Sequence, residues 1–229
     1  GLLADYQRSY QASTSTEEIG AGNRRYYSKL YPSIEQVAAV ECIDPDREGA
    51  NRITVRESYY VGDAWEVLGD GSEELYLEFY PLELESWVLF APSPARTAPY
   101  DPGMLGEVRV TTNVTLPEPC DVELEPIRIS GDGYAFQHEV RSEGQSMRIE
   151  YAYELTKPVI EPEATAGFLS AHKRMGEQLG IMLPAQLLLA TAPPQPGALA
   201  ALLFGLSLVG GTLAAFRVGT NYNPPPAAD

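Results

Sequence analysis

The fold is decided by residues 107–155, which read EVRVTTNVTLPEPCDVELEPIRISGDGYAFQHEVRSEGQSMRIEYAYEL. Apolar and polar residues alternate along most of this stretch, and the alternation stops only at short turn-like sequences such as SGDG (130–133) and SEGQ (142–145). Alternation with a period of two across tight turns is typical of antiparallel strands with one face buried and one face in water. We therefore expect a β-meander that forms at least one sheet of an antiparallel sandwich.

One irregularity interrupts this meander. Val122 and Leu124 occupy one parity, Pro126 follows, and Ile127 and Ile129 continue on the opposite parity. A change of parity next to a proline predicts a β-bulge or an edge strand, because proline cannot donate a ladder hydrogen bond.

The same alternation is found nearer the N-terminus, in two further stretches. The apolar positions there are Ile53, Val55, Tyr59, Val61, Leu75, Leu77 and Phe79. Glu83 and Glu85 follow with the spacing of a solvated strand face, alternating with leucines, which favours a surface role over a metal site. A proline-rich stretch at 91–103 is predicted to be a domain boundary or a long surface loop.

Two helices are predicted to flank the strands. Residues 15–31 begin with a capping box, Ser15 with Glu18, and end before Pro32. Residues 163–179 follow Pro162 and precede Gly180, a typical start and stop for a helix. The overall prediction is a mainly β (α+β) fold with flanking helices.

Charge restricts the class of partner. The chain has 229 residues with 16 Lys and Arg against 32 Asp and Glu, a formal net charge of -16. Binding to nucleic acid needs a basic surface, so we expect no nucleic-acid partner. The 2 cysteines, Cys42 and Cys120, are compatible with one disulfide or with two free thiols.

The C-terminal region contains a long apolar segment. Gly197 to Phe216, GALAALLFGLSLVGGTLAAF, carries no charge and is long enough for one transmembrane helix. Small residues spaced by four, Gly197, Ala201 and Gly205, form a ridge on which a partner helix could pack. The preceding IMLPAQLLLA (181–190) is short and contains a proline, which favours an interfacial segment.

The residues on either side of this segment predict its orientation in the membrane, and the N-terminus bears on whether the chain is part of a longer protein. Arg217 lies directly after it, and the positive-inside rule then favours a cytoplasmic tail and an exported β-domain of a single-pass membrane protein. The N-terminus, GLLADYQRSYQ, has no initiator Met, no basic region and no apolar region of a signal peptide. We expect the chain to be the C-terminal part of a longer protein.

Residues able to carry catalysis are few. His138 lies on the apolar parity of its strand and His172 on the apolar stripe of its helix, so both favour a core role. A Cys120–His138 pair is the one conceivable nucleophile and base, but no helix N-terminus or nearby cation activates the thiol. No metal-ligand spacing such as Cys-x-x-Cys occurs, and we predict no catalytic residue, no metal site and no cofactor in this chain.

One stretch resembles a known family. Residues 44–66, DPDREGANRITVRESYYVGDAWE, are similar to a segment of bacterial transglutaminase-like proteins that join a papain-like core to a domain of unknown function. In that family a Tyr-Pro is followed by D-D-R-x-A-N-R-L-x-V-x-E-x-Y and then a Trp. The counterparts here are Tyr31-Pro32, Asp46-Arg47, Ala50-Asn51-Arg52, Val55, Glu57, Tyr59 and Trp65, with a longer spacing between Arg47 and Ala50.

The resemblance extends over roughly residues 20–180. VRVTTNVTLPEPCDVE (108–123) and IEYAYEL (149–155) resemble the β-region that follows the family's catalytic core, and Leu179-Gly180 resembles the end of its closing helix. It implies that the catalytic Cys, His and Asp lie upstream of Gly1, so that no catalytic residue carries over to this chain.

The expected organisation follows from these patterns. It comprises a helical junction (1–40), an antiparallel β-sandwich domain (41–160), a closing helix (161–180), an interfacial segment and linker (181–196), a transmembrane helix (197–217) and a polar tail (218–229). The expected function is a non-catalytic accessory and membrane-anchoring region that packs on an upstream transglutaminase-like core. The alternatives are a stand-alone membrane-anchored binding or adhesion module, and an enzyme that uses Cys120 and His138.

Overall fold

The computed structural model describes residues 2–46, 52–62, 64–67, 75–88, 98–103, 105–116, 119–184 and 202–210. The elements are, in chain order, α1 (Leu2–Ser13), α2 (Thr16–Tyr27), β1 (Ile34–Gln36), β2 (Glu41–Asp46), β3 (Arg52–Val61), β4 (Glu66–Val67), β5 (Leu75–Phe79), α3 (Leu82–Val88), β6 (Gly106–Thr115), β7 (Glu123–Gly131), β8 (Tyr134–Glu143), β9 (Ser146–Leu155), α4 (Pro162–Gly176), β10 (Ile181–Pro184) and β11 (Leu202–Gly210).

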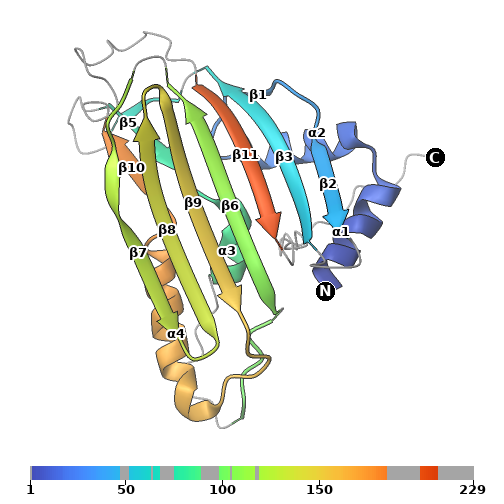
Figure 1. Ribbon diagram of the computed structural model, residues 1–229, viewed down its shortest axis with the longest axis vertical. Helices are drawn as coiled ribbons and strands as arrows, with labels where there is room; N and C mark the ends of the chain where they lie inside the picture. The colour runs from blue at the N-terminus through green and yellow to red at the C-terminus, as the bar shows by residue number, and fades with distance from the viewer. Residues whose placement is uncertain are drawn as a thin grey trace.

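Two antiparallel sheets contain these strands (Figure 1). The large sheet has the order β1-β3-β11-β6-β9-β8-β7, with β2 also paired to β3, and the small sheet has the order β10-β5-β4. Figure 1 shows the large sheet as one layer, with α3, α4 and the small sheet lying behind it. The prediction of a mainly β, antiparallel fold with flanking helices is confirmed.

The predicted turns and bulge are found where the sequence pattern indicates them. Gly131 pairs with Tyr134 across the first hairpin, and Glu143 pairs with Ser146 across the second. Gly133 and Gly144 in these turns have φ angles of 88° and 60°, a left-handed conformation that favours glycine. The register shifts between Leu124 and Ile127, and β7 lies at the edge of the sheet, as the parity change and Pro126 predict.

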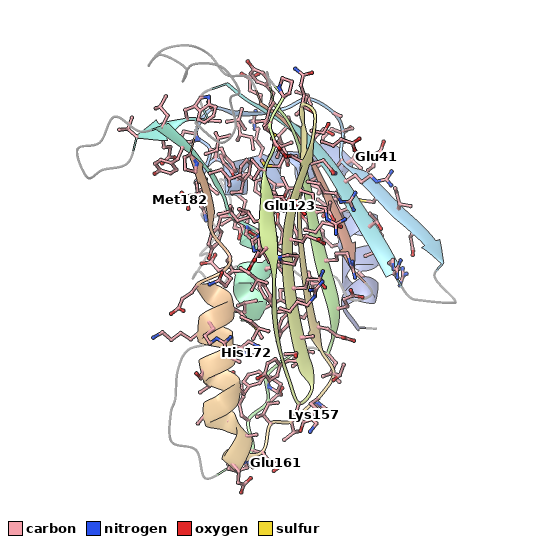
Figure 2. The ribbon with its side chains drawn as sticks, turned by 60° about the vertical axis from the view of Figure 1, so that its left-hand side comes forward. Glu41, Glu123, Lys157, Glu161, His172 and Met182 are labelled. Atoms are coloured by element: carbon pink, nitrogen blue, oxygen red, sulfur yellow. The ribbon has the colours of Figure 1, made fainter. Side chains whose placement is uncertain are left out.

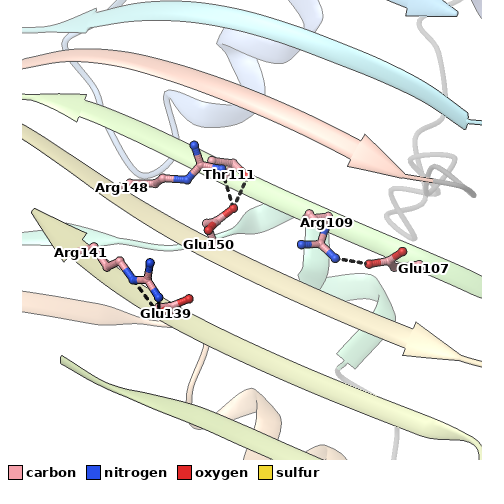
Figure 3. A network of polar contacts seen from close by, with 7 residues as sticks. All are labelled: Glu107, Arg109, Thr111, Glu139, Arg141, Arg148 and Glu150. Atoms are coloured by element: carbon pink, nitrogen blue, oxygen red, sulfur yellow. Dashed lines mark hydrogen bonds and ion pairs between the residues drawn. The ribbon is translucent and has the colours of Figure 1, made fainter. Parts of the chain in front are cut away.

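The large sheet has an apolar face and a charged face. On the charged face Arg109 binds Glu107 at 2.6 Å, Arg148 binds Glu150 at 2.7 Å, and Arg141 pairs with Glu139 (Figure 3). Each pair joins residues two apart on one strand, so each charge has its counterion beside it. The opposite face carries the buried side chains of the core, among them Val108, Val110, Val114, Phe136, Val140, Met147, Ile149, Tyr151 and Tyr153.

Helix α4 covers part of the apolar face (Figure 2). It corresponds to the predicted helix at 163–179, and Phe168, Ala171, His172 and Met175 on it are buried. Helix α2 begins at the predicted capping box, in which the Ser15 side chain accepts a hydrogen bond from the Glu18 amide and the Glu18 carboxylate accepts one from the Ser15 amide.

Two local predictions are wrong. Glu83 and Glu85 lie on helix α3, not on a strand, and Glu83 is buried. A stretch that alternates over a few residues fits both structures, and here Pro81 precedes a single helical segment. Residues 181–184 do not form an interfacial segment but strand β10, which pairs with β5 from Ile181–Phe79 to Pro184–Tyr76. The rest of 181–196 lies outside the described residues.

The apolar segment also differs from its prediction. Residues 202–210 form strand β11, which lies between β3 and β6 and pairs with both, and not part of a helix over 197–217. Gly205 is opposite Ser58 and Asn113, while Gly197 and Ala201 of the predicted helix-packing ridge lie outside the described residues. A continuous apolar run also suits a central strand, and the facing edges of β3 and β6 need partners for their backbone groups. Within the part of the chain described, no helix has the length and apolar character required to cross a membrane.

Candidate functional site: an acidic and aromatic pocket

A pocket lies between the apolar face of the large sheet and the layer behind it. Its outline takes in about 500 Å³ of space, a volume that includes open solvent. Its lining is aromatic and apolar with one carboxylate, and consists of Tyr27, Tyr31, Ile34, Tyr59, Phe79, Tyr80, Pro81, Glu83, Thr112, Ile149 and Tyr151. Aromatic and apolar walls with a few polar groups are typical of small-ligand sites.

Glu57 lies behind one wall of the pocket. It occupies a core-facing position of β3, where residues 53, 55, 57, 59 and 61 are all buried, and its exposed fraction is only 4%. Its carboxylate accepts a hydrogen bond from the Asn23 amide, and its Oε2 lies 3.2 Å from the Tyr27 hydroxyl oxygen; both partners are on α2. Because that hydroxyl has one proton, it donates to only one carboxylate at a time. The carboxylate is therefore held by neutral donors from a different element.

Glu83 is the carboxylate that lines the pocket. It is 5% exposed on the first turn of α3 and accepts a hydrogen bond from the same Tyr27 hydroxyl that contacts Glu57. Tyr26, the neighbour of Tyr27, fixes α2 against α3 by donating to the Leu82 carbonyl at 3.1 Å. One tyrosine thus links two buried carboxylates from β3 and α3.

The two carboxylates lack a cationic partner. Among the described residues, neither Glu57 nor Glu83 forms an ion pair, and burial raises the pKa of both groups. The pKa of Glu83 reaches about 7, because burial outweighs the hydrogen bond from Tyr27. Hydrogen bonds from Asn23 and Tyr27 offset part of the effect of burial on the Glu57 pKa. Near neutral pH the Glu83 carboxyl is therefore present in both its protonated and its ionised form.

The tyrosine hydroxyls around the pocket are mostly engaged. Tyr31 donates to the Glu78 carbonyl at 2.9 Å and Tyr151 donates to the Leu179 carbonyl at 2.6 Å. The Tyr59 hydroxyl is buried next to the Glu57 carboxylate. Burial raises the pKa of Tyr59, and the charge and hydrogen bonding of Glu57 raise it further. The Tyr59 ring meets that of Tyr27 edge to face, with centroids 5.3 Å apart, and is 2% exposed.

His138 lies on the core face of β8, as its parity predicts. Its ring stacks on Tyr151 with centroids 4.5 Å apart, and within the described part of the chain neither ring nitrogen has a hydrogen-bond partner. Burial lowers its pKa to about 4, so the ring is neutral at neutral pH.

His172 is a core residue with both nitrogens satisfied. Its Nδ1 lies 2.9 Å from the Phe168 carbonyl oxygen and its Nε2 lies 3.0 Å from the Tyr153 hydroxyl. Since a carbonyl only accepts, Nδ1 carries the proton and Nε2 accepts from Tyr153. Burial lowers the pKa of His172 to about 4.

The cysteines are not arranged as a catalytic pair. Cys42 and Cys120 are both free thiols, so the disulfide alternative does not apply. Burial raises the pKa of both thiols, the opposite of what an activated nucleophile requires. His138 makes no hydrogen bond to Cys120, and the geometry gives no support to an enzyme built on these two residues.

One residue of the sequence carries a signal for this pocket. Glu57 interrupts the apolar parity of Ile53, Val55, Tyr59 and Val61, and a lone carboxylate at a core position needs a partner inside the fold. Glu83 carried no comparable signal, because its burial depends on how α3 packs.

Comparisons with known proteins identify no relative. No family model, no curated protein and no solved structure matches this chain.

Within the described residues, no group of three or more His, Cys, Asp or Glu side chains is placed to hold a metal ion.

Proposed function

We propose that this chain is the non-catalytic accessory region of a transglutaminase-like protein, and that it packs on a papain-like core in the same protein. One observation carries the proposal: three of the residues that carry the resemblance lie at or beside one pocket. Tyr31 and Tyr59 line the pocket, and Glu57 lies directly behind it, 3.2 Å from the hydroxyl of a third lining residue, Tyr27. Tyr31 lies between α2 and β1, whereas Glu57 and Tyr59 lie on β3, so a shared strand pattern alone does not bring the three together.

The chemistry of the pocket supports the proposed accessory role. It offers a buried carboxylate and aromatic walls, which bind and orient a group, and the chain's cysteines and histidines lack the arrangement of a nucleophile and base. In a larger protein such a pocket would hold part of a substrate or of the neighbouring domain near the catalytic core.

The coding sequence upstream of Gly1 provides the first test. We expect it to encode a papain-like region with Cys, His and Asp, and its absence would overturn the proposal. If the region is present, it should co-purify with this chain when the two are expressed as separate polypeptides. A catalytic region that is fully active and never associates with this chain would contradict the accessory role.

Membrane anchoring by Gly197 to Phe216 is the second part of the proposal. It rests on the length and charge-free composition of the segment and requires residues 202–210 to leave the sheet. Carbonate extraction of cell membranes distinguishes the two states. Retention in the membrane pellet supports an anchor, and release into the soluble fraction supports a segment that stays in β11.

A stand-alone binding module is the alternative that the same pocket favours. It would apply if the upstream sequence encodes no catalytic region while the isolated chain folds and binds a ligand. The accessory region and the stand-alone module therefore make the same prediction for the pocket and differ only in whether the upstream sequence encodes a catalytic region.

A further inference from the structure

We propose that the pocket between α2, β3, β5 and α3 binds a quaternary ammonium group. The inference depends only on the geometry of the pocket and goes beyond the proposed accessory role, so it holds or fails whether or not an upstream catalytic core exists.

The walls of the pocket suit an organic cation. Six aromatic side chains line it, and the negative face of an aromatic ring attracts a cation within about 6 Å of its centroid. These side chains are Tyr27, Tyr31, Tyr59, Phe79, Tyr80 and Tyr151. They come from α2, from the turn before β1, from β3 and β9 of the large sheet, from β5 of the small sheet and from the residue after β5.

The charge of the site points to the same ligand class. Glu83 lines the pocket, Glu57 lies behind it, and among the described residues neither has an ion-pair partner. A buried carboxylate without a counterion is costly, and a bound cation would supply the missing charge.

The small number of charged acceptors favours a quaternary over a primary ammonium. A primary ammonium brings three N–H donors that need acceptors once water is removed. Among the lining side chains the one carboxylate is that of Glu83, which already accepts from Tyr27, and the other side-chain oxygens are neutral hydroxyls. A trimethylammonium group has no N–H to satisfy, and its methyl groups pack against aromatic faces.

Titration of the full chain with three matched probes tests the ligand class. Choline is the quaternary cation, 3,3-dimethylbutan-1-ol is its neutral carbon isostere, and ethanolammonium is its primary analogue. By isothermal calorimetry or NMR we expect choline to bind with a dissociation constant of about 1 mM or below. We expect binding at least about tenfold weaker for each of the other two. Equal binding of choline and the isostere, tighter binding of ethanolammonium, or no saturable choline binding would each overturn the proposal.

Variants on one helix locate the site. Glu83→Gln keeps the shape and removes the charge, and it should weaken choline at least about tenfold without changing the affinity for the neutral isostere. Glu85→Gln makes the same change on α3 outside the pocket lining and should leave choline binding unchanged. Choline binding that is lost equally in both variants, or in neither, would contradict this location.

Vesicles identify the source of the group. Sedimentation with phosphatidylcholine vesicles, compared with vesicles of phosphatidylethanolamine and phosphatidylglycerol, tests a lipid headgroup. Preference for phosphatidylcholine supports a lipid ligand, whereas choline binding without vesicle binding supports a free small molecule. Preference for the other vesicles, which lack a quaternary ammonium, would contradict the proposal.

Discussion

Glu83 is a carboxyl group placed where water cannot stabilise its charge. Its ordinary pKa of 4.5 rises to about 7 in the folded protein because it is buried, while the hydrogen bond from Tyr27 acts in the opposite direction. The titratable and charged groups that face this site come from α2 and the turn after it, from β3 and β9, and from the residue after β5. They are Arg24, Tyr26, Tyr27, Tyr31, Glu57, Tyr59, Tyr80 and Tyr151.

The raised pKa predicts a pH dependence of stability. Between pH 4.5 and about 7 the folded chain retains a proton at Glu83 that the unfolded chain releases. The stability that this proton contributes to the folded state is therefore fully present below pH 4.5 and is lost as pH rises through about 7. The free energy of unfolding lost in this way is at most about 3 kcal/mol.

Urea unfolding at pH 5 and pH 8 measures this effect. His138 and His172, whose pKa values are lowered to about 4, contribute stability that increases over the same range, so the wild type alone does not isolate Glu83. Relative to that of Glu83→Gln, the free energy of unfolding of the wild type should decrease as pH rises. Glu85→Gln should show no such shift, and parallel curves for wild type and Glu83→Gln would refute the prediction.

Substitution by Phe should affect stability differently at the two histidines. His172→Phe leaves the buried Tyr153 hydroxyl without its acceptor and should cost about 1–3 kcal/mol. His138→Phe removes two unpaired nitrogens and keeps a ring against Tyr151, so it should change stability by less than about 1 kcal/mol or increase it. Chemical denaturation at pH 8, where both rings are neutral, compares them. Equal losses would contradict the assigned environments.

At the scale of elements, β11 determines whether the large sheet is continuous. It pairs with β3 from Leu202–Val61 to Gly210–Ile53 and with β6 from Leu203–Thr115 to Gly210–Val108. Leu206 is in register with both Glu57 and Thr112, so β11 joins the two sides of the sheet beneath the pocket.

Hydrogen exchange tests this placement. When β11 is in the sheet, backbone amides of 202–210 should exchange as slowly as those of β6 and β9, because a central strand is hydrogen-bonded on both sides. The edge strand β7 serves as the internal reference for weaker protection. Fast exchange over 202–210, with β6 and β9 still protected, would show that the segment is outside the sheet in solution.

At the scale of the whole molecule, one hydrophobic core connects the layers. The buried side chains form a single cluster from Ile19 on α2 to Leu183 on β10, and both sheets contribute to it. The closing helix α4 contributes Phe168 and Met175 to the same cluster, and Trp87 on α3 lies 6.3 Å from the ring of Tyr153 on β9.

A shared core predicts cooperative unfolding. Met175 is fully buried, and Met175→Ala should cost about 2–5 kcal/mol. The loss should appear equally in tryptophan fluorescence and in far-UV circular dichroism, because α4 and the sheet unfold together. If the circular dichroism signal of the variant is lost at lower urea than the fluorescence, α4 is an independent unit and the prediction is wrong.

Much of the fold follows from local pattern. Alternation gave the strands from Gly106 to Leu155, the parity change gave the bulge near Pro126, and Ser15 with Glu18 gave the start of α2, because each depends on neighbours within a few residues. The candidate site was largely beyond such reasoning. Only Glu57 carried a signal, as a carboxylate on an apolar parity.

The sequence by itself determined the antiparallel strands, their hairpins, the two main flanking helices and the acidic charge, since these depend on periodicity, turn residues and composition. Only the tertiary structure decided that Glu83 is buried on a helix, that it meets Tyr27 and Glu57, and that residues 202–210 lie between β3 and β6. The physical reason is that burial and strand pairing depend on which distant surfaces meet, and an apolar run satisfies a lipid bilayer and a central strand equally well.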